Sequence, residues 1–200
     1  RIRVVYNALD ESRFNALPNK IDARKALGYS ERSILVLTAA RLVSWKGIDG
    51  VIRAIDEIRT DFPEVKLIVV GDGPERRQLE NLAAECNYPV QFLGFRTQQN
   101  LYHVMRAADV FILFSTYEGM PHSVLEAMAC GIPVVATSVG GTVEVIIDQA
   151  NGLLVPAGDE TALAETLGQL LSIPSLARKI SAGASNDLQR FSWDSLVRKT

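Results

Sequence analysis

The sequence has few of the residues that would mark a disulfide-stabilised or metal-binding protein. It contains two cysteines and two histidines among 200 residues. Cys86 and Cys130 cannot form a disulfide framework, and neither has the spacing of a metal ligand. We therefore expect no structural zinc site.

Charge of one sign and long apolar runs are lacking as well. The 21 basic and 23 acidic side chains give a formal net charge of −2, so no strong field for nucleic acid or an anionic membrane is expected. Apolar runs are short and interrupted, which predicts no transmembrane segment, and the N-terminus does not have the pattern of a signal peptide. The sequence favours a cytoplasmic protein.

What is present is the composition of an ordinary globular domain. Hydrophobic residues make up 48% of the chain and charged residues 22%. Its length of 200 residues is enough for one sizeable core but not for two catalytic halves. The chain opens on a strand-like run, Arg1–Tyr6, and stops inside a helical pattern at Val197–Thr200. Both ends suggest part of a longer protein.

Short apolar runs alternate with amphipathic stretches along the chain. The predicted strands are Ile34–Thr38, Lys66–Val70, Val90–Leu93, Val110–Phe114, Pro133–Ala136 and the short Leu153–Val155. The predicted helices are Ile48–Asp61, Glu75–Glu85, Gln98–Ala107, Ser123–Ala129, Thr142–Asp148, Glu160–Leu171, Leu176–Leu188 and Trp193–Lys199. Several strands are apolar at consecutive positions, as expected where both faces of a sheet are covered.

This alternation predicts an α/β fold: a single Rossmann-like domain over residues 1–200, with a doubly wound parallel sheet of about six strands and helices on both faces. Such sheets bind ligands beyond the carboxyl ends of their strands. The loops after Thr38, Val70, Leu93, Phe114 and Ala136 are therefore the candidate site.

The loop after the first of these strands carries two cations. Arg41 and Lys46 bracket a turn, and Gly47 precedes a helix. Both side chains could converge on a phosphate, where each charge-assisted hydrogen bond contributes about 1.5–3 kcal/mol. The glycine–lysine order does not match a P-loop. Solvated loop charges are an equally good interpretation of the spacing alone.

The next two loops are weaker signals. Gly71–Pro74 (GDGP) closes a strand and opens a helix, which favours a tight structural turn over a binding role. Gly94-Phe95-Arg96 could offer a platform on which a base stacks. Alternatively, Phe95 belongs to the core and Arg96 only faces solvent.

The loop after the fourth predicted strand is the most informative, with the sequence STYEGMPHSVLEAMACG. Gly119 and Pro121 force an irregular entry into a helix. The N–H groups around Met120, His122 and Ser123 are expected to be unpaired there, and with the helix dipole they make an anion site. We expect His122 to act as a hydrogen-bond donor rather than an acid or base.

Two carboxylates flank this anion site. Glu118 and Glu126 are eight residues apart, about 12 Å of rise if the segment were helical, which disfavours the roughly 5–9.5 Å pair of a glycosidase. Carboxylates set apart along a ligand suit the recognition of sugar or ribose hydroxyls, although both could simply cap and solvate the helix. Gly140-Gly141, after the fifth strand, is a second, weak candidate for close approach to a phosphate.

In order, these segments resemble the C-terminal, nucleotide-sugar-binding domain of GT-B fold glycosyltransferases of the large retaining family 4. The resemblance rests on VVYNALD at Val4–Asp10, the Arg41/Lys46 loop, GDGP, FLGF at Phe92–Phe95, and the E-x7-E stretch with EAMACGIPVVAT at Glu126–Thr137. Two positions depart from the family pattern: Ala8 stands where glycine is common, and Val143 where proline is frequent.

The resemblance implies a role for each charged residue. Arg41 and Lys46 would bind the donor diphosphate and stabilise it as a leaving group, so no metal would be required. Glu118 would bind the hydroxyls of the transferred sugar and Glu126 those of the ribose. The ligand would be a UDP-, GDP- or ADP-sugar, bound as the substrate and with no cofactor. Arg41, Lys46 and Glu126 would then line one shared hollow.

The resemblance also implies what the backbone and the rest of the protein would do. The backbone at Gly119, Met120, Pro121, His122 and Ser123 would contact the sugar and β-phosphate, and the base would be read beside the Phe95–Arg96 turn. The acceptor pocket would lie in an N-terminal domain absent from this chain, which alone should bind donor but transfer little. The parent would be a retaining, metal-independent hexosyltransferase of polysaccharide or glycoconjugate biosynthesis, in the cytoplasm or peripheral at the inner face of the membrane.

Two rival functions remain open at this stage. A sugar-nucleotide epimerase of the GT-B type shares the layout, although the E-x7-E stretch argues for the transferase. A non-catalytic nucleotide-binding module is the other, against which the presence of Arg41, Lys46, Glu118 and Glu126 counts. A nicotinamide-dependent dehydrogenase is disfavoured because its glycine fingerprint is missing after the strand that ends at Thr38.

Overall fold

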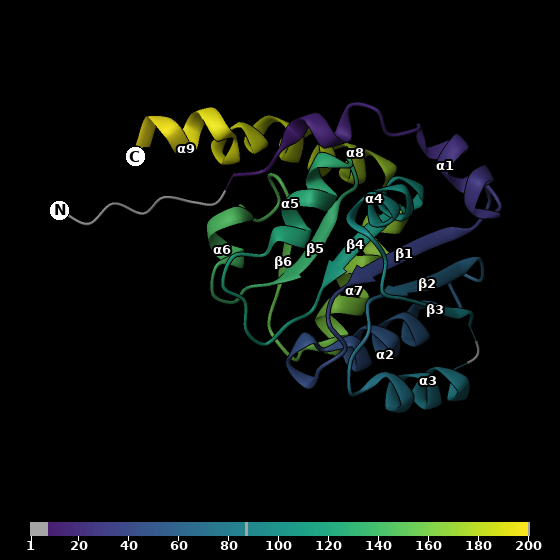
Figure 1. Ribbon diagram of the computed structural model, residues 1–200. Coiled ribbons are helices and arrows are strands. Elements are labelled where there is room, and N and C mark those ends of the chain that lie inside the picture. The colour runs from purple at the N-terminus through teal and green to yellow at the C-terminus, as the bar shows by residue number, and fades with distance from the viewer. Residues whose placement is uncertain (1–7, 87, 200) are drawn as a thin grey trace.

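The protein is described from a computed structural model, which places residues 8–86 and 88–199. Its centre is a six-stranded sheet in the order β3-β2-β1-β4-β5-β6, with every neighbouring pair parallel (Figure 1). The strands are β1 Ile34–Ala39, β2 Val65–Val70, β3 Val90–Gly94, β4 Val110–Leu113, β5 Val134–Thr137 and β6 Leu153–Val155. The predicted fold class and its six strands are confirmed.

Helices cover both faces of the sheet (Figure 1). The α-helices are α1 Lys20–Leu27, α2 Ile48–Ile58, α3 Arg76–Glu85, α4 Gln98–Ala107, α5 His122–Ala129, α6 Thr142–Val145, α7 Glu160–Ser172, α8 Pro174–Asp187 and α9 Trp193–Lys199. Among the residues that the structure places, three 3-10 turns accompany them: η1 Glu11–Phe14, η2 Ser44–Lys46 and η3 Leu188–Phe191. None of the helices within the described residues is long and apolar enough to cross a membrane.

The core is two layers, one on each side of the sheet. Helices α2, α3 and α7 pack on one face, and α1, α4, α5 and α6 pack on the other. Successive residues of β1 alternate between the layers, with Leu35 and Leu37 in one and Val36 in the other, all fully buried. This alternation explains why the strand is apolar at consecutive positions.

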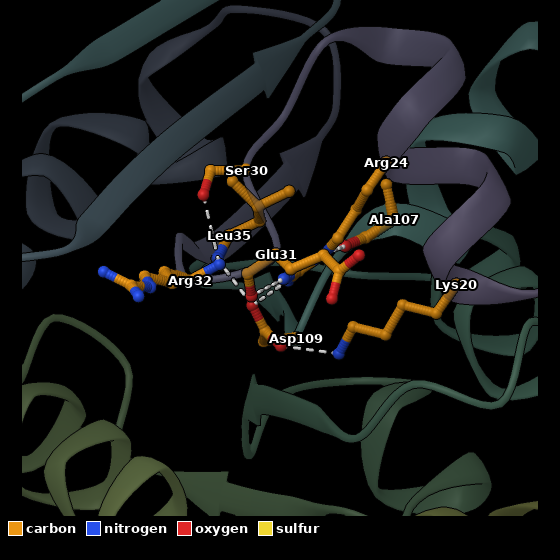
Figure 2. Close-up of polar contacts among 8 residues, drawn as sticks. All are labelled: Lys20, Arg24, Ser30, Glu31, Arg32, Leu35, Ala107 and Asp109. Carbon is orange, nitrogen blue, oxygen red and sulfur yellow. Dashed lines mark hydrogen bonds and ion pairs between the residues drawn. The ribbon is translucent and has the colours of Figure 1, made fainter.

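Helix α1, which the sequence analysis did not predict, is held by a buried arginine (Figure 2). Arg24, 5% exposed, donates to Asp109 Oδ2 at 2.5 Å and to the carbonyl oxygens of Ala107 (2.9 Å) and Glu31 (2.8 Å). Lys20 of the same helix pairs with the other oxygen of Asp109. Asp109 directly precedes β4, so these contacts fix α1 at the amino edge of the sheet.

Two predicted helices are shorter in the structure. Helix α6 ends at Val145 rather than Asp148, because the Asn151 side chain accepts from Ile147 N (2.7 Å) and donates to the Val145 carbonyl oxygen (3.1 Å), bonds that turn the backbone. Helix α2 ends at Ile58, where the next residues form a turn onto its carbonyl oxygen. The strand-like run at residues 1–6 lies outside the described residues.

Candidate functional site

The order of the strands locates the candidate site. Strands β2 and β3 lie on one side of β1, whereas β4, β5 and β6 lie on the other, so the winding direction reverses between β1 and β4. In doubly wound sheets the ligand crevice lies outside the carboxyl ends of the strands at this reversal. The loops that follow β1 and β4 here carry Arg41, Lys46, Glu118 and the entry into α5.

Glycines fit these loops against one another. A Cβ on Gly71, whose φ is +131°, would lie 1.9 Å from the carbonyl oxygen of Ala40, and one on Gly73 would lie 2.3 Å from that of Leu42. The Leu42 N–H donates to the carbonyl oxygen of Asp72 at 3.0 Å. The GDGP segment is therefore a structural turn that supports the Arg41 loop, as the sequence favours.

The Gly140-Gly141 pair has the same kind of role on the other side of the site. A Cβ on Gly141 would lie 1.5 Å from the carbonyl oxygen of Gly119, and the Gly141 N–H donates to the carbonyl oxygen of Glu118 at 3.0 Å. The pair thus packs against the loop after β4 and fixes the path of the backbone that carries Glu118.

Lys46 and Glu118 form an ion pair across the reversal point. Lys46 Nζ lies 2.5 Å from Glu118 Oε1, with the two side chains 20% and 9% exposed. The same oxygen accepts from Ser115 Oγ at 2.6 Å, and Thr137 Oγ1 donates to the Ser115 carbonyl oxygen at 2.5 Å. No partner of Glu118 Oε2 is found in the described part of the chain. The Glu118 carboxylate is therefore held through Oε1, and Oε2 is left to accept a hydrogen bond from a ligand.

Glu126 is held in the same way by helix α4. Its Oε1 accepts from Gln98 Nε2 at 2.8 Å and from the Tyr102 hydroxyl at 3.0 Å. These three side chains and His122 line a small hollow of about 140 Å³. Burial, followed by the neighbouring Glu126 carboxylate, raises the pKa of Tyr102, so the hydroxyl stays a donor.

Arg41 lies beside a larger hollow with the expected base-reading residues. A cavity of about 420 Å³ at the ends of β1 and β2 is lined by Arg41, Phe95, Arg96 and Leu101 among others. Phe95 is 78% exposed, so it does not belong to the core. The Arg41 guanidinium makes no hydrogen bond or ion pair with any residue that the structure places. The volume is in the range of small-molecule sites.

The entry into α5 has free donors, but fewer than the sequence predicts. Pro121 is the N-cap and offers no side-chain cap. The prediction that the His122 N–H is unpaired is wrong, because it donates to the Met120 carbonyl oxygen at 2.9 Å in a tight turn. Within the described ranges, the N–H groups of Met120 and Ser123 have no acceptor. Exposed Gly119 precedes them.

The structure thus gathers the predicted site residues at one edge of the sheet, in three groups rather than one. Lys46 pairs with Glu118, Arg41 lies with Phe95 and Arg96, and Glu126 lies with His122. The hollows around Arg41 and Glu126 share no lining residue, whereas the sequence analysis expects one shared hollow. Helix α4 borders both hollows, since Leu101 lines the first and Gln98 and Tyr102 line the second.

Sequence reasoning missed three residues that hold the carboxylates: Ser115, Gln98 and Tyr102. Ser115 stands three residues before Glu118, a spacing that could have suggested a local hydrogen bond. Gln98 and Tyr102 are 28 and 24 residues from Glu126, and nothing in the local pattern links them.

This topology matches the Rossmann-like C-terminal domains of GT-B glycosyltransferases. The sequence model described as "Glycosyl transferases group 1" matches residues 19–187, and the chain belongs to this family. That membership favours the glycosyltransferase over the epimerase and over the non-catalytic module.

Relatives agree with this family. A glycosyltransferase of Methanocaldococcus jannaschii is 32% identical over the whole of this chain and 53% of its own length. The GDP-mannose-dependent monoacylated alpha-(1-6)-phosphatidylinositol monomannoside mannosyltransferase of Corynebacterium glutamicum is 33% identical over 94% of this chain and 52% of its own. The chain spans about half the length of the curated relatives it matches.

Solved structures show the same fold. Anabaena HepE, crystallised with UDP and glucose, superposes with a TM-score of 0.88 and 28% identity, covering 98% of this chain and 54% of HepE. The C-terminal domain of the group 1 glycosyl transferase LpcC from Francisella tularensis superposes with a TM-score of 0.79 and 25% identity, covering 90% of this chain and 96% of that domain.

Proposed function

We propose that the chain is the donor-binding domain of a retaining family 4 glycosyltransferase, which transfers a glycosyl group from a nucleotide-diphosphate sugar to an acceptor hydroxyl. The observation that carries the proposal is the meeting of Lys46 and Glu118 at the reversal between β1 and β4. The family membership and the UDP and glucose in HepE support it.

The diphosphate would lie between the cations and the entry into α5. Arg41 has no competing partner among residues 8–86 and 88–199. The bond to Glu118 holds Lys46 at the same carboxyl edge of the sheet. The N–H groups of Met120 and Ser123 add two donors at the positive end of the α5 dipole. Together these groups neutralise a leaving diphosphate without a metal ion. Departure and attack on the same face of the sugar ring give retention of configuration.

The two glutamates bind hydroxyl groups. Glu118 and Glu126 each use Oε1 within the protein, which leaves Oε2 to accept from the ligand. We assign Glu118 to the transferred sugar, because it lies beside Lys46, and Glu126 to the ribose. The base occupies the 420 Å³ hollow beside Phe95 and Arg96. UDP, GDP and ADP are the candidate nucleotides.

The acceptor is bound by the part of the parent enzyme outside this chain. Since the chain spans about half of its curated relatives, we expect it to bind donor nucleotide and to transfer little or nothing alone. The parent acts in the cytoplasm or at the inner face of a membrane.

Calorimetric titration tests the assignment of Lys46. The chain is titrated with UDP, GDP and ADP and with the three matching nucleosides, and the titrations are repeated with Lys46→Ala. Loss of one charge-assisted contact lowers the affinity for the nucleoside diphosphate by about 10- to 150-fold and leaves the affinity for the nucleoside unchanged. Lys179→Ala, the same change on the exposed face of α8, is the matched control and leaves all affinities unchanged. Equal losses for diphosphate and nucleoside would rule out the phosphate contact.

A further inference from the structure

Helix α4 directs two donors at one oxygen of Glu126. Gln98 Nε2 and the Tyr102 hydroxyl both reach Oε1, from positions one turn apart on the same face of the helix. Glu126 Oε2 has no partner in the part of the chain that the structure describes. Two hydrogen bonds to one oxygen fix both the position and the rotation of a carboxylate, so the second oxygen has a defined direction.

Gln98 is itself oriented by an arginine. Arg13 Nη1 donates to Gln98 Oε1 at 2.6 Å, and Arg13 Nε lies 3.1 Å from Asp10 Oδ2. A guanidinium only donates, so the amide oxygen of Gln98 must face Arg13 and the amide nitrogen must face Glu126.

Tyr102 is fixed by packing. Tyr102 is only 3% exposed. The centroid of its ring lies 4.5 Å from that of the Phe14 ring, and the two ring planes are inclined by 40°. The ring therefore stays in place when the hydroxyl is removed, so Tyr102→Phe removes only what the hydroxyl contacts, its bond to Glu126 and its interaction with Arg13.

From this geometry we infer that Gln98 and Tyr102 are positioning residues for ribose recognition: they hold Glu126 by Oε1 so that Oε2 accepts from the ribose 2′-hydroxyl. The inference rests on the proposed function, which assigns Glu126 to the ribose. Its consequence is selectivity. A carboxylate oxygen held in one direction discriminates strongly between a hydroxyl and a hydrogen at the same carbon, because the analogue leaves a desolvated acceptor unpaired.

The test compares each nucleotide with its 2′-deoxy form. The chain is titrated with UDP and 2′-deoxy-UDP, GDP and 2′-deoxy-GDP, and ADP and 2′-deoxy-ADP, and the pair with the tightest binding is carried forward. We expect the wild-type chain to prefer the ribonucleotide by about tenfold or more. Tyr102→Phe and Gln98→Leu each reduce that preference by about fivefold. They leave the affinity for the 2′-deoxy form within about twofold, which a general loss of structure would not do.

Two further variants make the test specific. In a Glu126→Gln background the preference is already lost, so adding Tyr102→Phe has no further effect, a non-additivity that only residues acting through Glu126 produce. Tyr88→Phe is the matched control: it removes another buried hydroxyl bond, to the Ile52 carbonyl oxygen at 2.8 Å, and leaves the preference unchanged.

The outcomes separate the inference from the function on which it rests. If Glu126→Gln abolishes the preference but Tyr102→Phe and Gln98→Leu do not change it, the positioning role is overturned and the donor site stands. If Glu126→Gln keeps the preference, the ribose assignment of Glu126 fails and the inference fails with it. If none of the six nucleotides binds, donor binding itself is refuted.

Discussion

Arg24→Met tests whether one buried guanidinium holds helix α1 on the sheet. The variant keeps an apolar stem of similar length but removes three hydrogen bonds, two to carbonyl oxygens and one to Asp109 (Figure 2). Asp109 keeps two partners, the Lys20 ammonium and the Leu35 N–H at 2.6 Å. The carboxylate is therefore not orphaned, whereas the two carbonyl oxygens lose their donor.

The hydrogen bonds that are lost and kept set the expected loss of stability in Arg24→Met. Breaking a buried ion pair from one side costs about 3–5 kcal/mol, and the remaining partners of Asp109 place this case at the lower end, about 3 kcal/mol. For a domain of 150–250 residues each kcal/mol shifts Tm by about 2–4 °C. We expect Tm to fall by about 6–12 °C.

The assay is urea unfolding followed by circular dichroism, with a thermal scan for Tm. Lys20→Met is the matched control, because it removes a cation from the same carboxylate but from a side chain 46% exposed; it should cost less than about 1 kcal/mol. Nucleotide affinity should be unchanged in both variants, since Asp109 lies at the amino edge of the sheet, opposite the proposed donor site. A loss for Arg24→Met no larger than that for Lys20→Met would refute the reasoning.

Three smaller predictions concern reactivity, packing and the base site. Cys130 is 2% exposed, and burial raises the pKa of its thiol to about 12, so at pH 8 it stays protonated and resists alkylation while Cys86 reacts first, as timed mass spectrometry will show. Gly168→Ala, with open space for a Cβ in α7, raises stability by up to about 1 kcal/mol in urea unfolding, whereas Gly141→Ala forces a Cβ onto a backbone carbonyl oxygen and lowers it. Phe95→Ala leaves Tm unchanged but weakens nucleotide binding in calorimetry by about 1–3 kcal/mol.

The parts of the fold that the sequence predicts are those whose signal is local. Strand β1 is apolar at consecutive positions because both of its faces are covered, and that pattern is visible without knowing what covers them. Helix α1 gives no such signal, because its docking depends on a bond between Arg24 and Asp109, 85 residues further on. The early end of α6 likewise depends on bonds from the side chain of Asn151.

The candidate site likewise has parts that the sequence predicts and parts that it does not. Topology alone predicts which loops gather at the carboxyl edge, so Arg41, Lys46 and Glu118 could be named from the sequence. Their partners could not, because the Lys46–Glu118 pair joins residues 72 positions apart and requires β1 and β4 to be neighbours. Whether Gln98 meets Glu126 depends on the relative rotation of α4 and α5, which no local pattern encodes.

A crystal structure of the chain with the tightest-binding nucleoside diphosphate tests the central claim most directly. The account predicts the diphosphate at the carboxyl edge, between Arg41, Lys46 and the first N–H groups of α5, with a ribose hydroxyl on Glu126 Oε2. Diphosphate bound instead at the amino edge, in the hollow of about 500 Å³ that Arg106 lines beside Asp109, would contradict it.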